Sequence, residues 1–389
     1  MATARRPRLL GTFAHPDDET FCAGGTLATY VERGAEAMVA SATRGQAGQI
    51  RDGTRATRRT LADVREQELR AACAVLGVQH VACLDYTDGT LEDQDARLRG
   101  DVSELIEDFR PDVVITFGDD GAYGHPDHVA ISRLTTDAFL EATAGSQLTS
   151  GRLYHSHFPR SRLLLGERLS KWLVEMNARF KGTASFAQAL SLFAQESTTM
   201  GYAKDFVDIN WFPPRFTIVE QGEPAASLYL ILSGEVEVVH EQEDGSLRQL
   251  SRLGTGEFFG ELGVAHGVER SANVIAVDAV TCLLLSPSAP TQFAGRGPDA
   301  GFTGTAFGPA PIGSTATTVI DVSRQVSRKV AAIAAHRTQF PIEPSMFPAS
   351  MLQDMFGQEH FVRVHPPLDT ETDMLFSGTS ASPDLPRPS

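Results

Sequence analysis

The sequence predicts an α/β fold with a mostly parallel sheet, joined in one chain to an all-β unit. Up to about residue 158, apolar runs typical of buried strands alternate with stretches of helical periodicity, which predicts βαβ units. From Trp211 the pattern changes to short strands separated by glycines, which predicts a barrel or jelly roll. A strand and a helix follow after residue 314, and 389 residues are enough for two domains.

The α/β stretch contains strands and helices in strict alternation. Apolar runs predict strands at 9–14, 37–42, 81–84, 111–117 and 153–158. Helical periodicity predicts helices at 21–33, 61–76, 98–109 and 131–144. Gly24-Gly25 in the first helix allows close packing or a bent start. In the second helix, Arg65 and Glu68 are three residues apart, and we expect them to form an ion pair on its surface.

The first strand ends in the polar cluster His15-Pro16-Asp17-Asp18-Glu19. Proline cannot donate to a strand ladder, so the cluster lies at the carboxyl end of the strand, where open α/β sheets bind ligands. His15 and Asp18 are close enough in a turn to bind one ion, whereas Asp17 would point elsewhere. Catalytic zinc takes three protein ligands, so a third is expected from another strand tip. The segment 123–128, after the strand at 111–117, supplies candidates.

The motifs Ala14-His-Pro-Asp-Asp-Glu19 and His125-Pro-Asp-His128 resemble those of the PIG-L/LmbE family of zinc-dependent N-deacetylases. The resemblance implies zinc on His15, Asp18 and His128, with Asp17 as the general base. It further implies that His125 is the acid or an electrostatic partner, oriented by Asp127. The expected reaction is metal-assisted hydrolysis of an N-acetylglucosamine-like amide, with Tyr123 helping to stabilise the oxyanion.

Four other polar positions need an interpretation. Glu19 either orders the site from behind or occupies a helix first turn, where negative charge is favourable. Arg51 either lines the substrate pocket, as the family implies, or is a solvated loop charge; its glycine-bearing loop lacks G-x-G-x-x-G, so a dinucleotide site is disfavoured. We interpret His155 and His157 as polar strand residues, because the zinc needs no further protein ligand.

The all-β unit carries a segment with its own chemistry. Strands are expected at 217–219, 227–232, 235–240 and 247–253. The run Gly256-Glu-Phe-Phe-Gly-Glu-Leu262, followed by Arg270-Ser271-Ala272, offers backbone N–H groups and a guanidinium to an anion. Residues 211–293 resemble cyclic nucleotide-binding domains. That resemblance implies Glu261 on the ribose 2′-OH and Arg270 on the cyclic phosphate, beside Gly260, Leu262 and Ser271.

The identity of the nucleotide is set by details of this cassette. A threonine directly after the arginine favours cyclic GMP in that family, and its absence here makes cyclic AMP the preferred ligand. The long helix that normally closes over the base is replaced by the glycine- and proline-rich stretch 295–313, a linker. No helix-turn-helix follows, so a transcription factor of the usual kind is not expected. The alternative is a β-roll that has lost its ligand.

The segment after the linker resembles the closing part of PIG-L/LmbE proteins, with a strand at 317–322 and a helix at 325–337. The all-β unit is therefore expected to be an insertion in a Rossmann-like deacetylase domain. His336, in this segment, either helps to hold the oxyanion or is a helix C-terminal histidine favoured by the dipole. The expected division is deacetylase at 1–205 and 314–365, cyclic nucleotide-binding domain at 211–293, linker at 295–313 and a disordered tail at 366–389.

Composition restricts the partners. Lys+Arg 34 against Asp+Glu 49 gives a net charge of −15, which argues against nucleic acid and anionic membranes. No apolar stretch is long enough to span a bilayer, and residues 1–8 do not form a secretory signal. The four cysteines lack metal spacing and are typical of a reduced, cytoplasmic protein. A homo-oligomer is compatible with the sequence, which does not fix the oligomeric state.

The sequence thus predicts a zinc-dependent N-deacetylase for a small N-acetylated substrate, regulated by a cyclic nucleotide. Two other classes stay open. One is a cyclic-nucleotide-sensing signalling protein whose zinc site is not catalytic, and the other is a constitutive deacetylase with a structural β-roll. The unligated Asp17 beside a complete ligand set argues against the first.

Overall fold

A computed structural model describes residues 5–48, 50, 54–145, 148, 151–157, 207–225, 227–266, 268–285, 316–342, 344–346, 349–368 and 375–376. Arg51 and the expected linker 295–313 lie outside the described residues, so their interpretation stays a prediction. Residues 158–206 also lie outside the described part of the chain.

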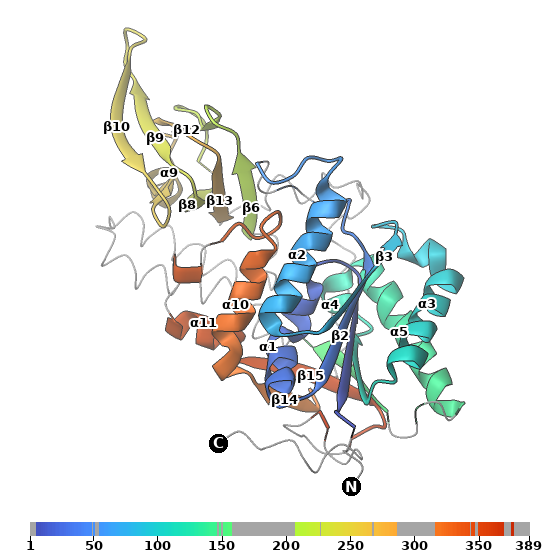
Figure 1. Cartoon of the computed structure of the whole chain (residues 1–389). Helices are drawn as coiled ribbons and strands as arrows, with labels where there is room; N and C mark the ends of the chain where they lie inside the picture. The colour runs from blue at the N-terminus through green and yellow to red at the C-terminus, as the bar shows by residue number, and fades with distance from the viewer. Residues whose placement is uncertain are drawn as a thin grey trace.

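A seven-stranded sheet forms the centre of the α/β part (Figure 1). Its strands, in spatial order, are β14 (Thr318–Asp321), β15 (Gln358–His365), β5 (Arg152–His157), β4 (Val113–Phe117), β1 (Arg8–Phe13), β2 (Glu36–Thr43) and β3 (His80–Tyr86). The strands β1 to β5 pair in parallel, and β15 is antiparallel to both of its neighbours. The expected mostly parallel sheet is confirmed.

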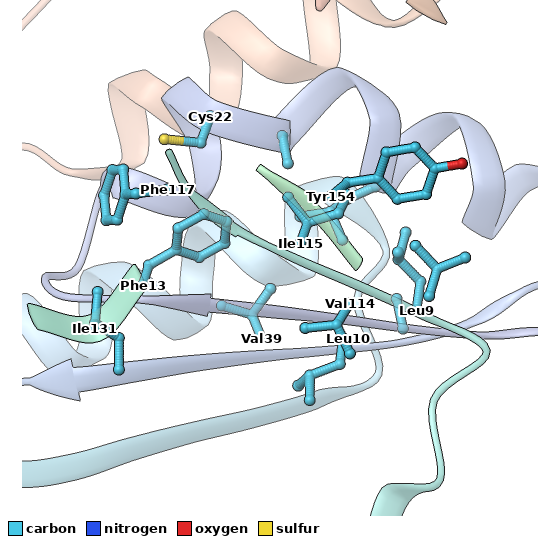
Figure 2. Packing of buried hydrophobic residues seen from close by; sticks show 14 of the residues in the cluster. Leu9, Leu10, Phe13, Cys22, Val39, Val114, Ile115, Phe117, Ile131 and Tyr154 are labelled. Carbon is cyan, nitrogen blue, oxygen red and sulfur yellow. The ribbon is translucent and has the colours of Figure 1, made fainter. Parts of the chain in front are cut away.

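Helices cover both faces of this sheet. On one side α1 (Asp18–Glu32), α2 (Leu61–Leu76) and α10 (Val326–Ala335) pack on one another, and on the other α3 (Asp95–Phe109) packs on α5 (Pro126–Ala144) (Figure 1). The continuous apolar strands place their side chains in the resulting core, where the Phe13 and Phe117 rings meet edge to face at 5.7 Å (Figure 2). The helix α11 (Ala349–Phe356) was not expected from the sequence.

Polar groups fix the closing segment to the first two helices. The Glu359 carboxylate accepts hydrogen bonds from the backbone N–H groups of Gly25 and Thr26 in α1, both at 2.8 Å, and from Lys329 Nζ at 2.6 Å. Glu68 of α2 accepts from the backbone N–H and the hydroxyl of Thr338, at 2.7 and 2.6 Å. Since Glu68 is buried, the expected surface ion pair with Arg65 is wrong, and each of the two has its own buried partners.

The second part of the chain forms two antiparallel four-stranded sheets, as the expected jelly roll requires. One has the order β10 (Leu247–Leu253), β9 (Val236–Glu241), β12 (Asn273–Ala276), β7 (Thr217–Val219), and the other β11 (Phe258–Phe259), β8 (Leu228–Ser233), β13 (Val280–Leu285), β6 (Val207–Phe212). Their inner faces share an apolar cluster that includes Ile231, Val236 and Cys282. The first and last described residues of this part, Val207 and Leu285, pair with each other.

Two residues of the expected disordered tail are bound to the α/β core. Leu375 and Phe376 are buried, and the Leu375 carbonyl accepts from Arg152 Nη1 at 3.2 Å and from the Tyr154 hydroxyl at 3.0 Å. The Leu375 N–H donates to the Tyr30 hydroxyl at 2.8 Å. The disorder predicted for 366–389 is therefore wrong at these two positions. Among the residues that the structure describes, no helix is both long and apolar enough to cross a bilayer.

Candidate functional site

The polar clusters meet where the strand order of the sheet reverses. From β1 the chain continues to β2 and β3 on one side, and to β4 and β5 on the other. Such a switch point leaves a crevice at the carboxyl ends of the strands. The segment after β1 carries His15 to Glu19, and the segment after β4 carries His125 to His128. Because β1 and β4 are parallel neighbours, both clusters reach the same crevice.

The three predicted metal ligands converge within it. His15 Nδ1 lies 3.2 Å from His128 Nε2, and 3.4 Å from Asp18 Oδ2. His128 Nε2 lies 3.4 Å from Asp18 Oδ1. All three residues are buried, and their ligand atoms are close enough together to bind one cation. Two imidazole nitrogens and one carboxylate form a donor set that suits zinc, so the residues present fit the metal.

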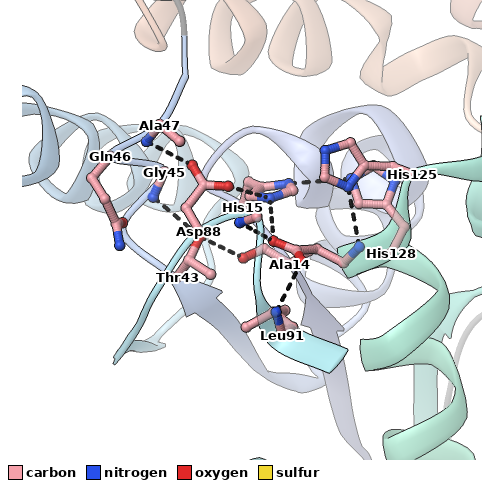
Figure 3. Close-up of polar contacts among 12 residues, drawn as sticks. Ala14, His15, Thr43, Gly45, Gln46, Ala47, Asp88, Leu91, His125 and His128 are labelled. Atoms are coloured by element: carbon pink, nitrogen blue, oxygen red, sulfur yellow. Dashed lines mark hydrogen bonds and ion pairs between the residues drawn. The ribbon is translucent and has the colours of Figure 1, made fainter. Parts of the chain in front are cut away.

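Further contacts orient both imidazoles. His128 Nδ1 donates to the Gly121 carbonyl at 3.1 Å, which leaves Nε2 with its lone pair toward the cluster. His15 Nε2 lies 3.0 Å from Asp88 Oδ1 and 3.3 Å from Asp127 Oδ2, so its proton is held on the side away from the cluster (Figure 3). Carboxylates behind a ligating histidine are typical of metal sites, where they fix the tautomer.

Burial and neighbouring charges shift the pKa of each of the three predicted ligands. Burial alone would lower the pKa of His15, but hydrogen bonds to Asp127, Asp18 and Asp88 outweigh it and raise this pKa. Burial would raise the pKa of Asp18, and the charges of His128 and His15 instead hold it well below its usual range. Burial lowers the pKa of His128 despite the neighbouring Asp18. These carboxylates therefore supply the negative charge that a bound cation needs.

Asp17 lies beside the cluster in a strained conformation. Its φ of 116° is one that L-residues rarely adopt, at a typical cost of about 1–3 kcal/mol. Arg65, buried in α2, donates from Nη2 to Asp17 Oδ2 at 3.0 Å and to the Pro16 carbonyl at 2.6 Å, and from Nη1 to the Gly45 carbonyl at 2.8 Å. Burial raises the pKa of Asp17 to about 6, although the charge of Arg65 opposes the shift.

The second motif does more than supply a ligand. His125 caps α5, with its Nδ1 accepting from the Asp127 N–H at 3.2 Å, and its ring stacks on that of His128. Burial, with the charges of His15 and His128, lowers the pKa of His125 to about 4. The Asp127 carboxylate accepts from the Gly89 and Leu91 N–H groups and faces His15. Its contact with a ligand histidine was not predicted.

Of the other two predicted catalytic residues, the structure describes the side chain of His336 and not that of Tyr123. Tyr123 belongs to the short helix α4 (Gly121–Gly124), and its side chain lies outside the described residues. His336 ends α10 and is fully buried, with Nε2 2.8 Å from Glu19 Oε1. Burial alone would lower the pKa of His336, but the charge and hydrogen bond of Glu19 raise it.

The cassette of the β-roll surrounds a buried arginine. Arg270 donates from Nη1 to the Gly260 carbonyl at 3.0 Å and from Nη2 to the Ser227 carbonyl at 2.8 Å. Gly260 has a φ of 91°, and a Cβ there would lie 2.7 Å from Arg270 Nη1, so glycine is required. Glu261 begins the short helix α9 (Glu261–His266), and the next residue, Leu262, is exposed. The Ser271 carbonyl accepts a hydrogen bond from His240 Nδ1.

Comparison with known proteins assigns both parts of the chain. Residues 10–139 match the family model for GlcNAc-PI de-N-acetylase (PIG-L), and residues 209–295 match that for the cyclic nucleotide-binding domain. The chain thus carries a PIG-L domain and a cyclic nucleotide-binding domain. Both resemblances found in the sequence are confirmed.

Curated relatives of the PIG-L domain are named 1D-myo-inositol 2-acetamido-2-deoxy-alpha-D-glucopyranoside deacetylase. Those of a Mycobacterium species (strain KMS) and of Mycolicibacterium gilvum are 40% and 41% identical, over 35% and 36% of this chain and 51% and 56% of theirs. That of Actinosynnema mirum is 35% identical over 43% of this chain and 65% of its own. The chain spans about half the length of the first two relatives.

The environment of Arg270 suits the anion that a cyclic nucleotide-binding domain implies. Within the described part of the chain, no carboxylate lies within 4.0 Å of its guanidinium, which is 8% exposed as a residue. Burial lowers the pKa of Arg270, because a buried charge without a partner is disfavoured. A guanidinium has five N–H donors in a planar fork, and the two carbonyls leave some of them for a phosphate.

Two residues of the PIG-L site were missed in the sequence. Asp88 follows β3, so the rule that ligands bind at the carboxyl ends of strands could have found it. Arg65 lies four residues from both Leu61 and Leu69, and this spacing puts it on the buried face of α2. Its charge was instead interpreted as a sign of exposure. His155, which was left out of the ligand set, is a buried strand residue bound to Thr136 Oγ1 at 2.9 Å.

Proposed function

We propose that this protein is a zinc-dependent N-deacetylase for a small N-acetylated substrate of the N-acetylglucosamine type. The observation that carries the proposal is the convergence of His15, Asp18 and His128 on one point, with the acidic Asp17 next to it and held by Arg65. A site that served only as a scaffold has no need of an additional buried carboxylate in a strained conformation. The names of the curated relatives support the substrate class.

His15, Asp18 and His128 would hold the zinc, and zinc when bound activates water and polarises carbonyl groups. Asp17 takes a proton from the attacking water as a carbon–oxygen bond forms at the acetyl carbon. The carbon–nitrogen bond then breaks, and the leaving nitrogen receives a proton from His125 or Asp17. The products are acetate and a free amine. Arg65 keeps the Asp17 carboxylate in place, and Tyr123 is the proposed oxyanion donor.

Acetate release tests the proposal. The purified protein, loaded with zinc, is incubated with 1D-myo-inositol 2-acetamido-2-deoxy-alpha-D-glucopyranoside and with N-acetylglucosamine, and both acetate and free amine are measured. We expect release from at least one substrate, with loss of turnover after chelation of the metal. In Asp17→Asn we expect zinc to stay bound and kcat to fall about 10²–10⁴-fold, as for the loss of a general base. Full turnover in this variant, or none in the wild type on any N-acetylated sugar, would contradict the proposal.

We further propose that a cyclic nucleotide, cyclic AMP rather than cyclic GMP, regulates the deacetylase. The order of the strands supports an insertion, because β14 and β15, which follow the β-roll in the chain, belong to the same sheet as β1 to β5. Ser156, at the end of β5, and Thr318, at the start of β14, both pair with Phe361. The chain therefore leaves the sheet after β5 and re-enters it at β14. These two strands are two positions apart in the sheet, a distance of roughly 10 Å, and both points lie near the edge that carries the site.

A further inference from the structure

We propose that Glu19 and His336 form a positioning pair that fixes the strained backbone of Asp17. The inference rests on the proposed function, since it names the groups that keep the general base of that reaction in place. It decides between the two interpretations of Glu19 in favour of a role behind the metal ligands. It also assigns His336 to the support of Glu19 behind the base, in place of a role in holding the oxyanion.

The first step is the contact between Glu19 and Asp17. The backbone N–H of Asp17 donates to Glu19 Oε2 at 2.9 Å. Asp17 is one of four described residues other than glycine with a positive φ, and it precedes the first residue of α1. A conformation of this kind persists only where the surroundings impose it. The Glu19 carboxylate holds the Asp17 backbone, and Arg65 holds the carboxylate of the same residue.

The second step is the support of Glu19 itself. Its side chain is fully buried, and Oε1 accepts from the Thr20 hydroxyl at 2.6 Å and lies 2.8 Å from His336 Nε2. A buried carboxylate is stable only when it is paired and hydrogen-bonded. Within the described chain, His336 is the one basic side chain within 4.0 Å of Glu19. Without the imidazole, we expect the Glu19 carboxylate to move and to lose its hydrogen bond from the Asp17 N–H.

The third step is the rigidity of His336. Its N–H donates to the Ile333 carbonyl at 3.1 Å, and its own carbonyl accepts from the N–H groups of Gln339 and Phe340 at 3.0 and 2.7 Å. The imidazole is fully buried, and Glu19 already occupies Nε2. A side chain so enclosed is suited to support another group and is poorly placed to touch a substrate. A change in the position of α10 would therefore move His336 and, through Glu19, the backbone of Asp17.

Glu68 provides a matched control. It is a buried carboxylate that binds the same turn, through Thr338, yet its bonds do not reach Asp17. We compare Glu19→Gln, His336→Ala, His336→Gln and Glu68→Gln for unfolding midpoint, zinc content, kcat, KM and hydrogen exchange at the Asp17 amide. A glutamine at 19 has one acceptor oxygen in place of two. A glutamine at 336 keeps an N–H donor.

In Glu19→Gln and His336→Ala we expect faster exchange at Asp17 and a fall in kcat of about 10–100-fold, typical for partners one shell removed from a metal site. KM and zinc content should change little, and His336→Gln should recover part of both losses. Glu68→Gln should lower the unfolding midpoint while leaving the Asp17 exchange rate and kcat as in the wild type. Unchanged exchange at Asp17 in Glu19→Gln, or the same loss of kcat in Glu68→Gln, would overturn the inference. If the wild type releases no acetate, the proposed function fails, and the exchange rates still decide whether the pair fixes Asp17.

Discussion

At the scale of single residues, the candidate site is organised by two histidines. In each, one ring nitrogen faces the cluster and the other has a hydrogen-bond partner behind it. His15 has carboxylates near both ring nitrogens, with Asp18 toward the cluster and Asp88 and Asp127 behind it. His128 uses a backbone carbonyl for the same purpose, and its ring stacks on Phe117 with the centroids 4.0 Å apart. Each imidazole is therefore held in the orientation that a metal requires, with a hydrogen-bond acceptor on the ring nitrogen that faces away from the cluster.

Removal of His128 should abolish stable zinc binding. Two remaining ligands cannot hold a tetrahedral ion well, so His128→Ala should purify with a zinc content well below one ion per chain. His155→Ala is the matched control, since it deletes another buried histidine at a strand tip that binds Thr136 and lies outside the cluster. The metal content of both variants can be measured by atomic emission after dialysis. Full occupancy in His128→Ala would contradict the ligand assignment.

The sequence predicted most of this constellation because its key residues are local. His15 and Asp18 share one turn, and the parallel-strand rule brings the second motif to the same edge. What it did not predict are contacts between distant segments. The pairs Glu19–His336 and Glu68–Thr338 join residues 317 and 270 positions apart. Neither partner carries a local pattern that names the other, so only the packed structure shows them.

At the scale of elements, α1 depends on its two glycines in different ways. A Cβ at Gly25 would lie 2.6 Å from Cβ of Val322, in the closing segment, so the two backbones approach too closely for any side chain. A Cβ at Gly24 would make ordinary contacts of 3.4 Å with Thr20 and 3.5 Å with Lys329. The glycine pair was predicted to allow close packing or a bent start, and the structure assigns close packing to Gly25 alone.

This difference predicts opposite effects of the same substitution. Gly25→Ala should destabilise the protein by about 1–3 kcal/mol, because the overpacked helix must move away from Val322. Gly24→Ala should be neutral or stabilise it by up to about 1 kcal/mol, because alanine loses less backbone entropy in a helix. Urea unfolding followed by circular dichroism measures both. Equal effects of the two substitutions would show that α1 and the closing segment do not pack as described.

The elements themselves were predictable to the extent that their patterns are long and regular. The predicted bounds of α2, 61–76, agree with the structure, because an amphipathic pattern of sixteen residues ends at Gly77 in a left-handed conformation. The short α11 and the buried Leu375-Phe376 were missed. Two apolar residues in a proline- and serine-rich stretch give no periodic signal, and their partners Tyr30 and Tyr154 lie far away in the sequence.

At the scale of the whole molecule, the buried tail residues should contribute to stability. Phe376 is 2% exposed, with its ring 5.0 Å from that of Tyr30. Phe376→Ala leaves a cavity in the core and should cost about 3–5 kcal/mol. Leu140→Ala, at a position 40% exposed on α5, is the control and should change stability by less than about 0.5 kcal/mol. A Phe376→Ala variant as stable as the wild type would show that the tail does not bind the core.

The β-roll and the site are connected through the segment that carries His336. That segment begins with β14, after the β-roll in the chain, and it contacts α1 and α2 through Glu359, His336 and Thr338. A shift of α10 would therefore reach Glu19 and Asp17 directly. A ligand of the β-roll can act on the site only to the extent that it binds two states of the chain with different affinities.

We accordingly predict that cyclic AMP binds the wild-type protein and changes its deacetylase rate, and that Arg270→Ala loses both effects while keeping its zinc. The substitution removes a buried guanidinium that has no carboxylate partner in the described part of the chain. Arg252→Ala removes an exposed arginine of β10, in the same β-roll, and should respond as the wild type does. Coupling between binding at two sites is reciprocal, so an amine product that binds the PIG-L site should change the affinity for nucleotide by the factor by which nucleotide changes the affinity for product, about 5–150-fold for typical couplings. Calorimetry with cyclic AMP and cyclic GMP, with and without product, measures it. Tight binding of cyclic AMP with no change in rate and no effect of product would make the β-roll a separate binding module in a constitutive enzyme.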